Sequence, residues 1–146
     1  MADDDVRSVI DRQAVSDLLV GYVQALDRRD WETVARCFAS DAVFIHPAGG
    51  VEGPDEIVGR ARAALDPLDA SQHLLGSILV NVDGDDAQAT SYFHAQHVRA
   101  GAPGGDLYVI AGTYRDRLRR GAKGWAIFER VQDYSWRSGN PEVIVR

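Results

Sequence analysis

The sequence predicts a single α+β domain, residues 1–146, in which about three N-terminal helices pack on one face of a curved, mixed or antiparallel sheet. Three observations lead to this fold class. The length of 146 residues corresponds to about one domain. Apolar residues of the first half recur with the period of an α-helix, whereas the second half consists of long strand-like runs between glycine-rich turns. Helices that precede the strands, rather than alternate with them, are typical of α+β domains.

The first half of the chain predicts three helices. The first spans residues 6–26, where apolar side chains recur along one face. This apolar stripe consists of Ile10, Ala14, Val15, Leu18, Leu19, Tyr22, Val23 and Leu26. Asp30 is expected to cap a short second helix that extends to Phe38. Pro54 in the first turn, followed by two acids, begins a third helix that ends near Leu65.

The remaining segments predict strands. Residues 42–45 form a brief apolar run, and the proline and glycines at residues 47–50 predict a turn after it. Four longer strands are expected at residues 72–81, 87–99, 107–120 and 125–136. Because only short glycine-containing segments separate them, these strands predict an antiparallel meander.

Composition and charge exclude several classes of function. The chain has 16 Lys and Arg against 22 Asp and Glu, a net charge of −6, so it lacks the basic surface of a protein that binds nucleic acid or an anionic membrane. No apolar run reaches the ~20 residues of a membrane span, and the acidic N-terminus is unlike a signal peptide. The only cysteine, Cys37, excludes an internal disulfide and a cysteine-based zinc site, and we expect it to be a buried, inert thiol. These features predict a soluble, cytoplasmic protein.

The strand at residues 87–99 has two different faces. One face carries small and apolar side chains and ends at His97, whereas His94 lies on the more polar face. The apolar face is expected to point toward the helices or into a cavity. A histidine buried there is either a hydrogen-bonded structural residue or part of a site, and burial alone does not distinguish the two.

The strand at residues 107–120 carries a row of arginines on one face. Arg115, Arg117 and Arg119 alternate with residues that face the other way. We interpret the row as a solvated strand face paired with acids on a neighbouring strand. A phosphate or nucleic-acid site is the alternative, which the acidity of the chain disfavours.

Asp27 and His73 are candidates for a hydrogen-bonded pair. An aspartate bonded to one ring nitrogen of a histidine fixes its tautomer and stabilises the charge that the ring gains as a base. The alternatives are a loop carboxylate paired with a nearby arginine and an exposed histidine at a strand edge, and the spacing does not decide between them. Asp27, His73, His94 and His97 are the candidate metal ligands, but no two of them have the helical i, i+4 spacing, and the chain has no phosphate-binding loop, so no metal or other cofactor is expected.

Six short segments occur in an order that is similar to one known family. They are LDRRDW at 26–31, FASDA at 38–42, GPDEI at 53–57, QHL at 72–74, GTYRD at 112–116 and GW at 124–125. Together they extend over almost the whole chain and resemble the SnoaL-like family of the nuclear-transport-factor-2-like superfamily. The resemblance implies a cone-shaped, cystatin-like α+β fold, and it says less about function, because this fold hosts many activities.

The resemblance also implies roles for particular residues. Dehydratases and dehydrochlorinases of this superfamily share an aspartate after the first helix and a histidine that opens a long strand, and Asp27 and His73 stand at these positions. His97 matches a second pocket histidine on the next strand. Arg120 matches a functional arginine that follows a Gly-Thr-Tyr strand.

The sequence departs from the family pattern at two positions. One dehydratase of the family has two tyrosines that hold a water molecule against the substrate carbonyl, where this chain has Leu26 and His46. The resemblance therefore implies that another group polarises the carbonyl, and His46, Tyr114 and Tyr22 are the candidates.

These residues predict a cofactor-independent acid/base enzyme, either a dehydratase or related lyase, or an isomerase or cyclase. His73, held by Asp27, would remove a proton next to a carbonyl, and His97 would donate to the leaving oxygen or to the enolate. The expected substrate is a small hydrophobic carbonyl compound such as a polyketide, steroid or terpenoid. The residues expected to contact it are Tyr22, His46, Phe93, Tyr114 and Arg120.

A non-catalytic protein of the same fold is the alternative. It would bind a small ligand or serve as an assembly subunit, and the two histidines and the aspartate would form a buried polar network that shapes its pocket. The resemblance further implies a homodimer or homotrimer formed through the open face of the sheet.

Overall fold

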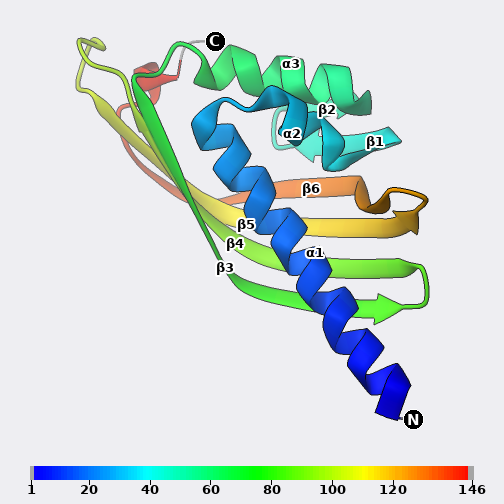
Figure 1. The fold of residues 1–146 in the computed structure, drawn as a ribbon. Helices are drawn as coiled ribbons and strands as arrows, with labels where there is room; N and C mark the ends of the chain where they lie inside the picture. The colour runs from blue at the N-terminus through cyan, green and yellow to red at the C-terminus, as the bar shows by residue number, and fades with distance from the viewer. Residues whose placement is uncertain (1, 145–146) are drawn as a thin grey trace.

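The computed structural model describes residues 2–144 of the chain and confirms the α+β fold class (Figure 1). Within these residues, three helices and six strands occur in the order α1 (Ala2–Arg28), α2 (Trp31–Arg36), β1 (Phe38–His46), β2 (Gly49–Glu52), α3 (Gly53–Leu65), β3 (Ala70–Asp83), β4 (Asp86–Val98), β5 (Leu107–Gly121) and β6 (Gly124–Gly139). A short 3₁₀ helix, η1 (Pro141–Val143), follows them. Within the described residues, no helix has the length and apolarity that crossing a membrane would require.

The six strands form one mixed sheet in the order β2-β1-β6-β5-β4-β3. Strands β3 to β6 are the predicted antiparallel meander, and β1 joins it by pairing parallel to β6. The strands β3, β4 and β5 bend strongly along their length, and the helices lie on the concave side of the sheet (Figure 1). Helix α1 packs against β3 and helix α3 packs against β1, so a space enclosed by helices and sheet remains between them.

Strand β3 contains a bulge that changes which side chains face inward. Residues Gly76 and Leu79 pair with Tyr92 and Thr90, so β3 has one more residue than β4 over this stretch. Ser77, inside the bulge, has a left-handed φ of 49°. Side chains at odd-numbered positions are the less exposed ones before the bulge, and those at even-numbered positions after it.

Two predictions about the first half of the chain are wrong in detail. The turn predicted at residues 47–50 occupies only residues 47–48, because residues 49–52 form strand β2, in which Val51 pairs with Phe44 in a hairpin. Helix α2 ends at Arg36, before the predicted end at Phe38, because Phe38 pairs with Ile127 as the first residue of β1. The expected cap is present, since the Asp30 carboxylate accepts a hydrogen bond from the Thr33 backbone.

The core lies between the helices and the concave face of the sheet. The apolar face of β4 is buried as predicted, from Ala87 to His97, and His94 on the opposite face is exposed. The stripe on α1 is buried only from Val15 onward. Ile10 is 60% exposed because the N-terminal turns of α1 extend past the sheet (Figure 1).

Candidate active site

A cavity of about 910 Å³ lies between helices α1 and α3 and the concave face of the sheet. This volume is within the range of roughly 300–1,000 Å³ that small-molecule sites occupy. Most of its wall is apolar. Six of the residues predicted for the site line it, namely Tyr22, His46, His73, Phe93, His97 and Tyr114.

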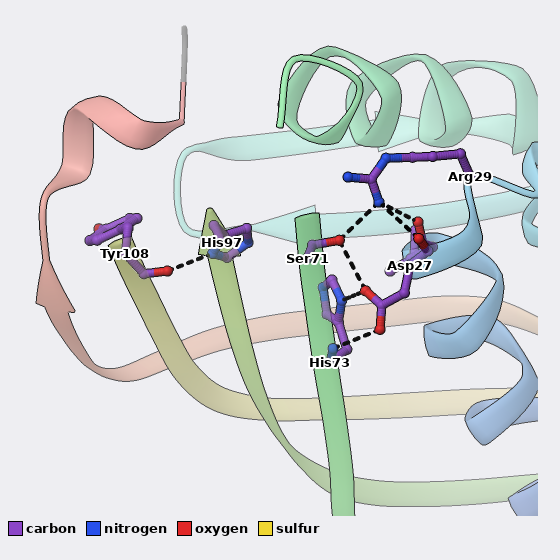
Figure 2. A network of polar contacts seen from close by, with 7 residues as sticks. Asp27, Arg29, Ser71, His73, His97 and Tyr108 are labelled. Carbon is purple, nitrogen blue, oxygen red and sulfur yellow. Dashed lines mark hydrogen bonds and ion pairs between the residues drawn. The ribbon is translucent and has the colours of Figure 1, made fainter. Parts of the chain in front are cut away.

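Asp27 and His73 form a close hydrogen-bonded pair at this cavity (Figure 2). Asp27 is the penultimate residue of α1, and His73 lies near the start of β3. His73 Nδ1 lies 2.6 Å from Asp27 Oδ1, and the His73 backbone N–H donates to Asp27 Oδ2 at 2.8 Å. The His73 side chain is only 7% exposed, which rules out the exposed edge histidine. Because a carboxylate accepts, Nδ1 carries the proton, and Nε2 keeps the lone pair of a base.

The surroundings of Asp27 keep its carboxyl ionised. Burial opposes the charge, but the hydrogen bonds from the side chain and backbone of His73 outweigh burial and hold the pKa of Asp27 below its usual value. The Ser71 hydroxyl donates a further hydrogen bond to Asp27 Oδ1, at 3.0 Å. The pair therefore carries a fixed negative charge beside the ring that would gain a proton.

Sequence reasoning missed the support that Ser71 and Arg29 provide. Arg29 Nη1 donates to the Ser71 hydroxyl and to the Leu26 carbonyl, both at 2.8 Å, and so connects the end of α1 to the start of β3 (Figure 2). Arg29 has a left-handed φ of 59°, which is uncommon for a residue other than glycine. Ser71 could have been found from the sequence, because it lies two positions before His73 and shares its strand face.

His97 lies close to His73, and its surroundings keep it neutral. The centres of the two rings are 6.1 Å apart, and His97 Nδ1 lies 3.1 Å from the Tyr108 carbonyl oxygen (Figure 2). Burial, with the nearby His73, lowers the pKa of His97 to about 4. Since a carbonyl only accepts, Nδ1 holds the proton and Nε2 is an acceptor. The expected role of His97 as a donor to the leaving oxygen does not fit this neutral tautomer.

His97 is therefore expected to stay uncharged down to about pH 4. In an unfolded chain a histidine titrates near 6.5, so between these two values the unfolded state binds more protons. The free energy of unfolding should consequently fall as the pH is lowered from 6.5 to 4. Above pH 6.5, the stabilisation that neutral His97 gives to the folded state should be fully present. An NMR titration of the ring protons should give a midpoint near 4, and His97→Asn should weaken the pH dependence of stability. A midpoint near 6.5 would contradict this assignment.

His46 lines another part of the cavity. Its Nδ1 lies 2.9 Å from Gln132 Oε1, and its ring stacks on Phe44 at 4.0 Å between ring centres. Burial, together with the charge of Arg60, lowers the pKa of His46 to about 4. A neutral His46 can contact a substrate but carries no positive charge with which to stabilise an oxyanion.

Tyr22 and Tyr114 also line the cavity. Both side chains are buried, and burial raises the pKa of each phenol above its usual value. The phenols therefore stay protonated at neutral pH and can donate hydrogen bonds. Phe93 packs against Tyr114 with ring centres 4.6 Å apart and completes this apolar wall.

Arg130 is a second feature that sequence reasoning missed. It lies fully buried on β6 and forms a two-point ion pair with Asp116 of β5, at 2.6 and 2.9 Å. Its guanidinium also stacks on two tyrosine rings: the Arg130 Cζ atom lies 4.5 Å from the ring centre of Tyr22 and 4.0 Å from that of Tyr114. Asp116 outweighs the effect of burial and raises the pKa of Arg130, so the pair is charged beneath the two tyrosines.

Arg120 does not line the cavity. It forms ion pairs with Asp11 at 2.6 Å and Asp85 at 3.0 Å, and it stacks on Trp125. Tyr108 of β5 is the cross-strand neighbour of His97, and Arg120 lies twelve positions further along the same strand. At about 3.3 Å per residue, these twelve positions correspond to roughly 40 Å of extended strand. The structure therefore places Arg120 at the far end of the sheet from His73 and His97.

The arginine row on β5 is the predicted solvated face. Arg115 pairs with Asp133 at 2.5 Å and Arg117 with Glu129 at 4.0 Å, both acids being on the neighbouring strand β6. Arg119 pairs instead with Asp41 of β1.

Cys37 is buried, and its thiol lies 3.3 Å from the Thr33 carbonyl oxygen. Burial raises its pKa to about 11, which makes it a poor nucleophile at neutral pH. Across residues 2–144, no three His, Cys, Asp or Glu side chains gather in a way that could hold a metal ion.

Comparison with known proteins connects this fold and site to one family. An uncharacterised protein of Mycobacterium tuberculosis is 32% identical over 130 residues, 87% of each chain. The terrestric acid biosynthesis cluster protein E of Penicillium crustosum is 28% identical over 140 residues, 92% of this chain and 89% of that protein. A hexachlorocyclohexane dehydrochlorinase of Novosphingobium barchaimii has the same fold, with a TM-score of 0.79 and 16% identity over 94% of both chains. A model of the SnoaL-like domain matches residues 7–131, and the chain therefore belongs to the SnoaL-like family.

Proposed function

We propose that this protein is an acid/base enzyme that acts on a small hydrophobic carbonyl compound, as a lyase or isomerase, without a cofactor. The proposal rests on the hydrogen-bonded pair of Asp27 and His73, in which Oδ1 of Asp27 lies 2.6 Å from Nδ1 of His73. This pair lies beside a mostly apolar cavity of about 910 Å³. The Asp27 carboxylate fixes the ring tautomer in which Nε2 can accept a proton, and an apolar wall strengthens each electrostatic contact.

In the proposed reaction, His73 Nε2 takes a proton from the carbon next to the substrate carbonyl. The electron pair of the broken C–H bond moves to form an enolate, and Asp27 stabilises the imidazolium. The hydroxyl groups of Tyr22 and Tyr114 donate hydrogen bonds to the enolate oxygen. If a hydroxyl group occupies the β position, the enolate expels it as His73 returns the proton, which yields an α,β-unsaturated carbonyl and water. His97 Nε2 accepts a hydrogen bond from a substrate hydroxyl.

Two of the relatives support this class of reaction. A dehydrochlorinase eliminates hydrogen chloride, which also requires removal of a carbon-bound proton. The Penicillium protein is named for a biosynthetic cluster, as expected for a protein that converts small molecules.

The test uses the wild-type protein with the aldol adduct of benzaldehyde and acetone, and with its naphthaldehyde analogue, in deuterium oxide. We expect deuterium to enter the position next to the carbonyl and the conjugated ketone to appear. NMR measures the first and ultraviolet absorbance the second. A protein that binds these ketones but catalyses neither change would instead be the ligand-binding alternative.

We also propose that the protein forms a homodimer or homotrimer through the convex face of the sheet. That face exposes large apolar side chains, including Leu74 (62% exposed), Tyr92 (61%) and Trp136 (48%), around a shallow hollow. Monomers rarely leave such side chains clustered in water. Sedimentation at micromolar concentration should show a dimer or trimer, and Tyr92→Lys should shift it toward monomer. A wild-type monomer would contradict the proposal.

A further inference from the structure

We propose that the substrate carries a carboxylate, or a similar anionic group, that binds Arg60 and Arg137 at the solvent-open part of the cavity. This inference rests on the proposed function only in taking the cavity as the substrate site. It adds a class of substrate, a hydrophobic carbonyl acid, that the residues around His73 do not specify.

Arg60 and Arg137 line the same cavity from different elements, α3 and β6. Arg60 is half-buried and Arg137 is exposed, whereas the His73 side chain is 7% exposed. The two guanidinium groups therefore lie toward the solvent, and the proposed base lies deeper in the cavity.

Neither arginine forms an ion pair with a carboxylate within residues 2–144. Arg60 Nη1 has a single long contact with the Gly49 carbonyl oxygen, at 3.4 Å, and Arg137 lies 5.9 Å from the centre of the Tyr134 ring. Asp133 is the one acid among the described residues that line the cavity, and Arg115 already engages it at 2.5 Å. In a chain with more acids than bases, two arginines that line the same cavity without an acid partner favour an anionic ligand.

The distribution of charge also orients such a ligand. The positive charge of Arg60 reaches the cavity wall, since it contributes to the lowered pKa of His46. Asp27 places a negative charge behind His73 and repels a second carboxylate from that end. A carbonyl acid would therefore enter with its carboxylate toward Arg60 and Arg137 and its reactive carbon toward His73. A guanidinium group suits this task because its paired N–H donors match the two oxygens of a carboxylate.

The test compares two probes of the same shape, naphthylacetate and naphthylacetamide, which differ in charge. Isothermal titration calorimetry would measure the binding of each to the wild type, to Arg60→Gln, to Arg137→Gln and to the double variant. We expect the wild type to bind the carboxylate about tenfold more tightly than the amide, as for a charge-assisted hydrogen bond. The double variant should bind the two probes equally, and each single variant should fall between.

Arg62→Gln is the matched control. Arg62 lies on the same helix as Arg60, but it pairs with Asp66 at 3.2 Å and does not line the cavity. This variant should keep the preference for the carboxylate, and circular dichroism should show all variants folded. A wild type that binds the amide as well as the carboxylate, or binds neither at millimolar concentration, contradicts the inference. So does a double variant that keeps the preference.

The calorimetry does not depend on turnover. If the carboxylate is preferred but deuterium exchange is absent, the anion site stands and the acid/base function fails. If exchange occurs on neutral ketones without any carboxylate preference, the function stands and the anion site fails.

Discussion

Replacing His73 by glutamine is expected to lower the rate of the proposed proton transfer by about 10²- to 10⁴-fold. Glutamine is similar in size and can keep a hydrogen bond to Asp27, but its amide does not accept a proton at neutral pH. The loss should appear in kcat rather than in KM, because the variant keeps the shape of the cavity. Deuterium uptake next to the ketone carbonyl, followed by NMR, measures the rate directly.

His94→Gln is the control for this experiment. His94 lies on the same sheet, three residues before His97, but on the exposed convex face. Its replacement should leave the exchange rate unchanged. Exchange at the wild-type rate in His73→Gln would remove His73 as the base, whereas equal losses in both variants would point to damage of the fold.

Asp116→Asn is expected to destabilise the protein by about 3–5 kcal/mol, the cost of breaking a buried ion pair from one side. Asp116 and Arg130 are both fully buried. Without Asp116, the guanidinium of Arg130 would stay charged and unpaired between the rings of Tyr22 and Tyr114, because arginine does not lose its proton. Urea unfolding of wild type and variant, followed by circular dichroism, measures the difference in the free energy of unfolding.

Two further variants separate the charge effect from simple loss of contacts. The double variant Asp116→Leu with Arg130→Met removes both charges and should recover much of the lost stability. Arg115→Gln breaks an ion pair whose two side chains are 53% and 55% exposed, and it should change stability little. An Asp116→Asn protein as stable as Arg115→Gln would show that the buried pair does not stabilise the fold.

Much of the fold follows from local sequence signals. The period of α1, the proline at the start of α3 and the glycine-rich turns between strands each act within a few residues. The parallel pairing of β1 with β6 was not predictable in this way. It joins residues that are about ninety positions apart, such as Phe38 and Ile127, and no local pattern encodes that register.

The candidate site likewise combines features that the local sequence predicts with contacts that depend on how distant elements pack. Asp27 and His73 are a candidate pair by residue type, but only the family resemblance favours their contact, since the two residues lie on elements whose relative placement the sequence does not give. Asp116 alternates with the exposed arginines of β5, so its inward direction could have been predicted. Its pairing with Arg130 could not, because that contact depends on the register of β5 against β6.

The bulge in β3 decides on which side of the sheet the proposed base lies. Next to the hairpin between β3 and β4, the inward-facing side chains of β3 are those of Val82 and Val80. In a strand without a bulge, only even-numbered side chains would face inward along the whole of β3. His73 would then share the convex face with Gln96 instead of lying beside Ala95. The single extra residue near Ser77 reverses the phase and turns His73 and Ser71 toward Asp27. Deleting one residue at this point would turn the His73 side chain toward solvent while nearly all of the fold stays unchanged.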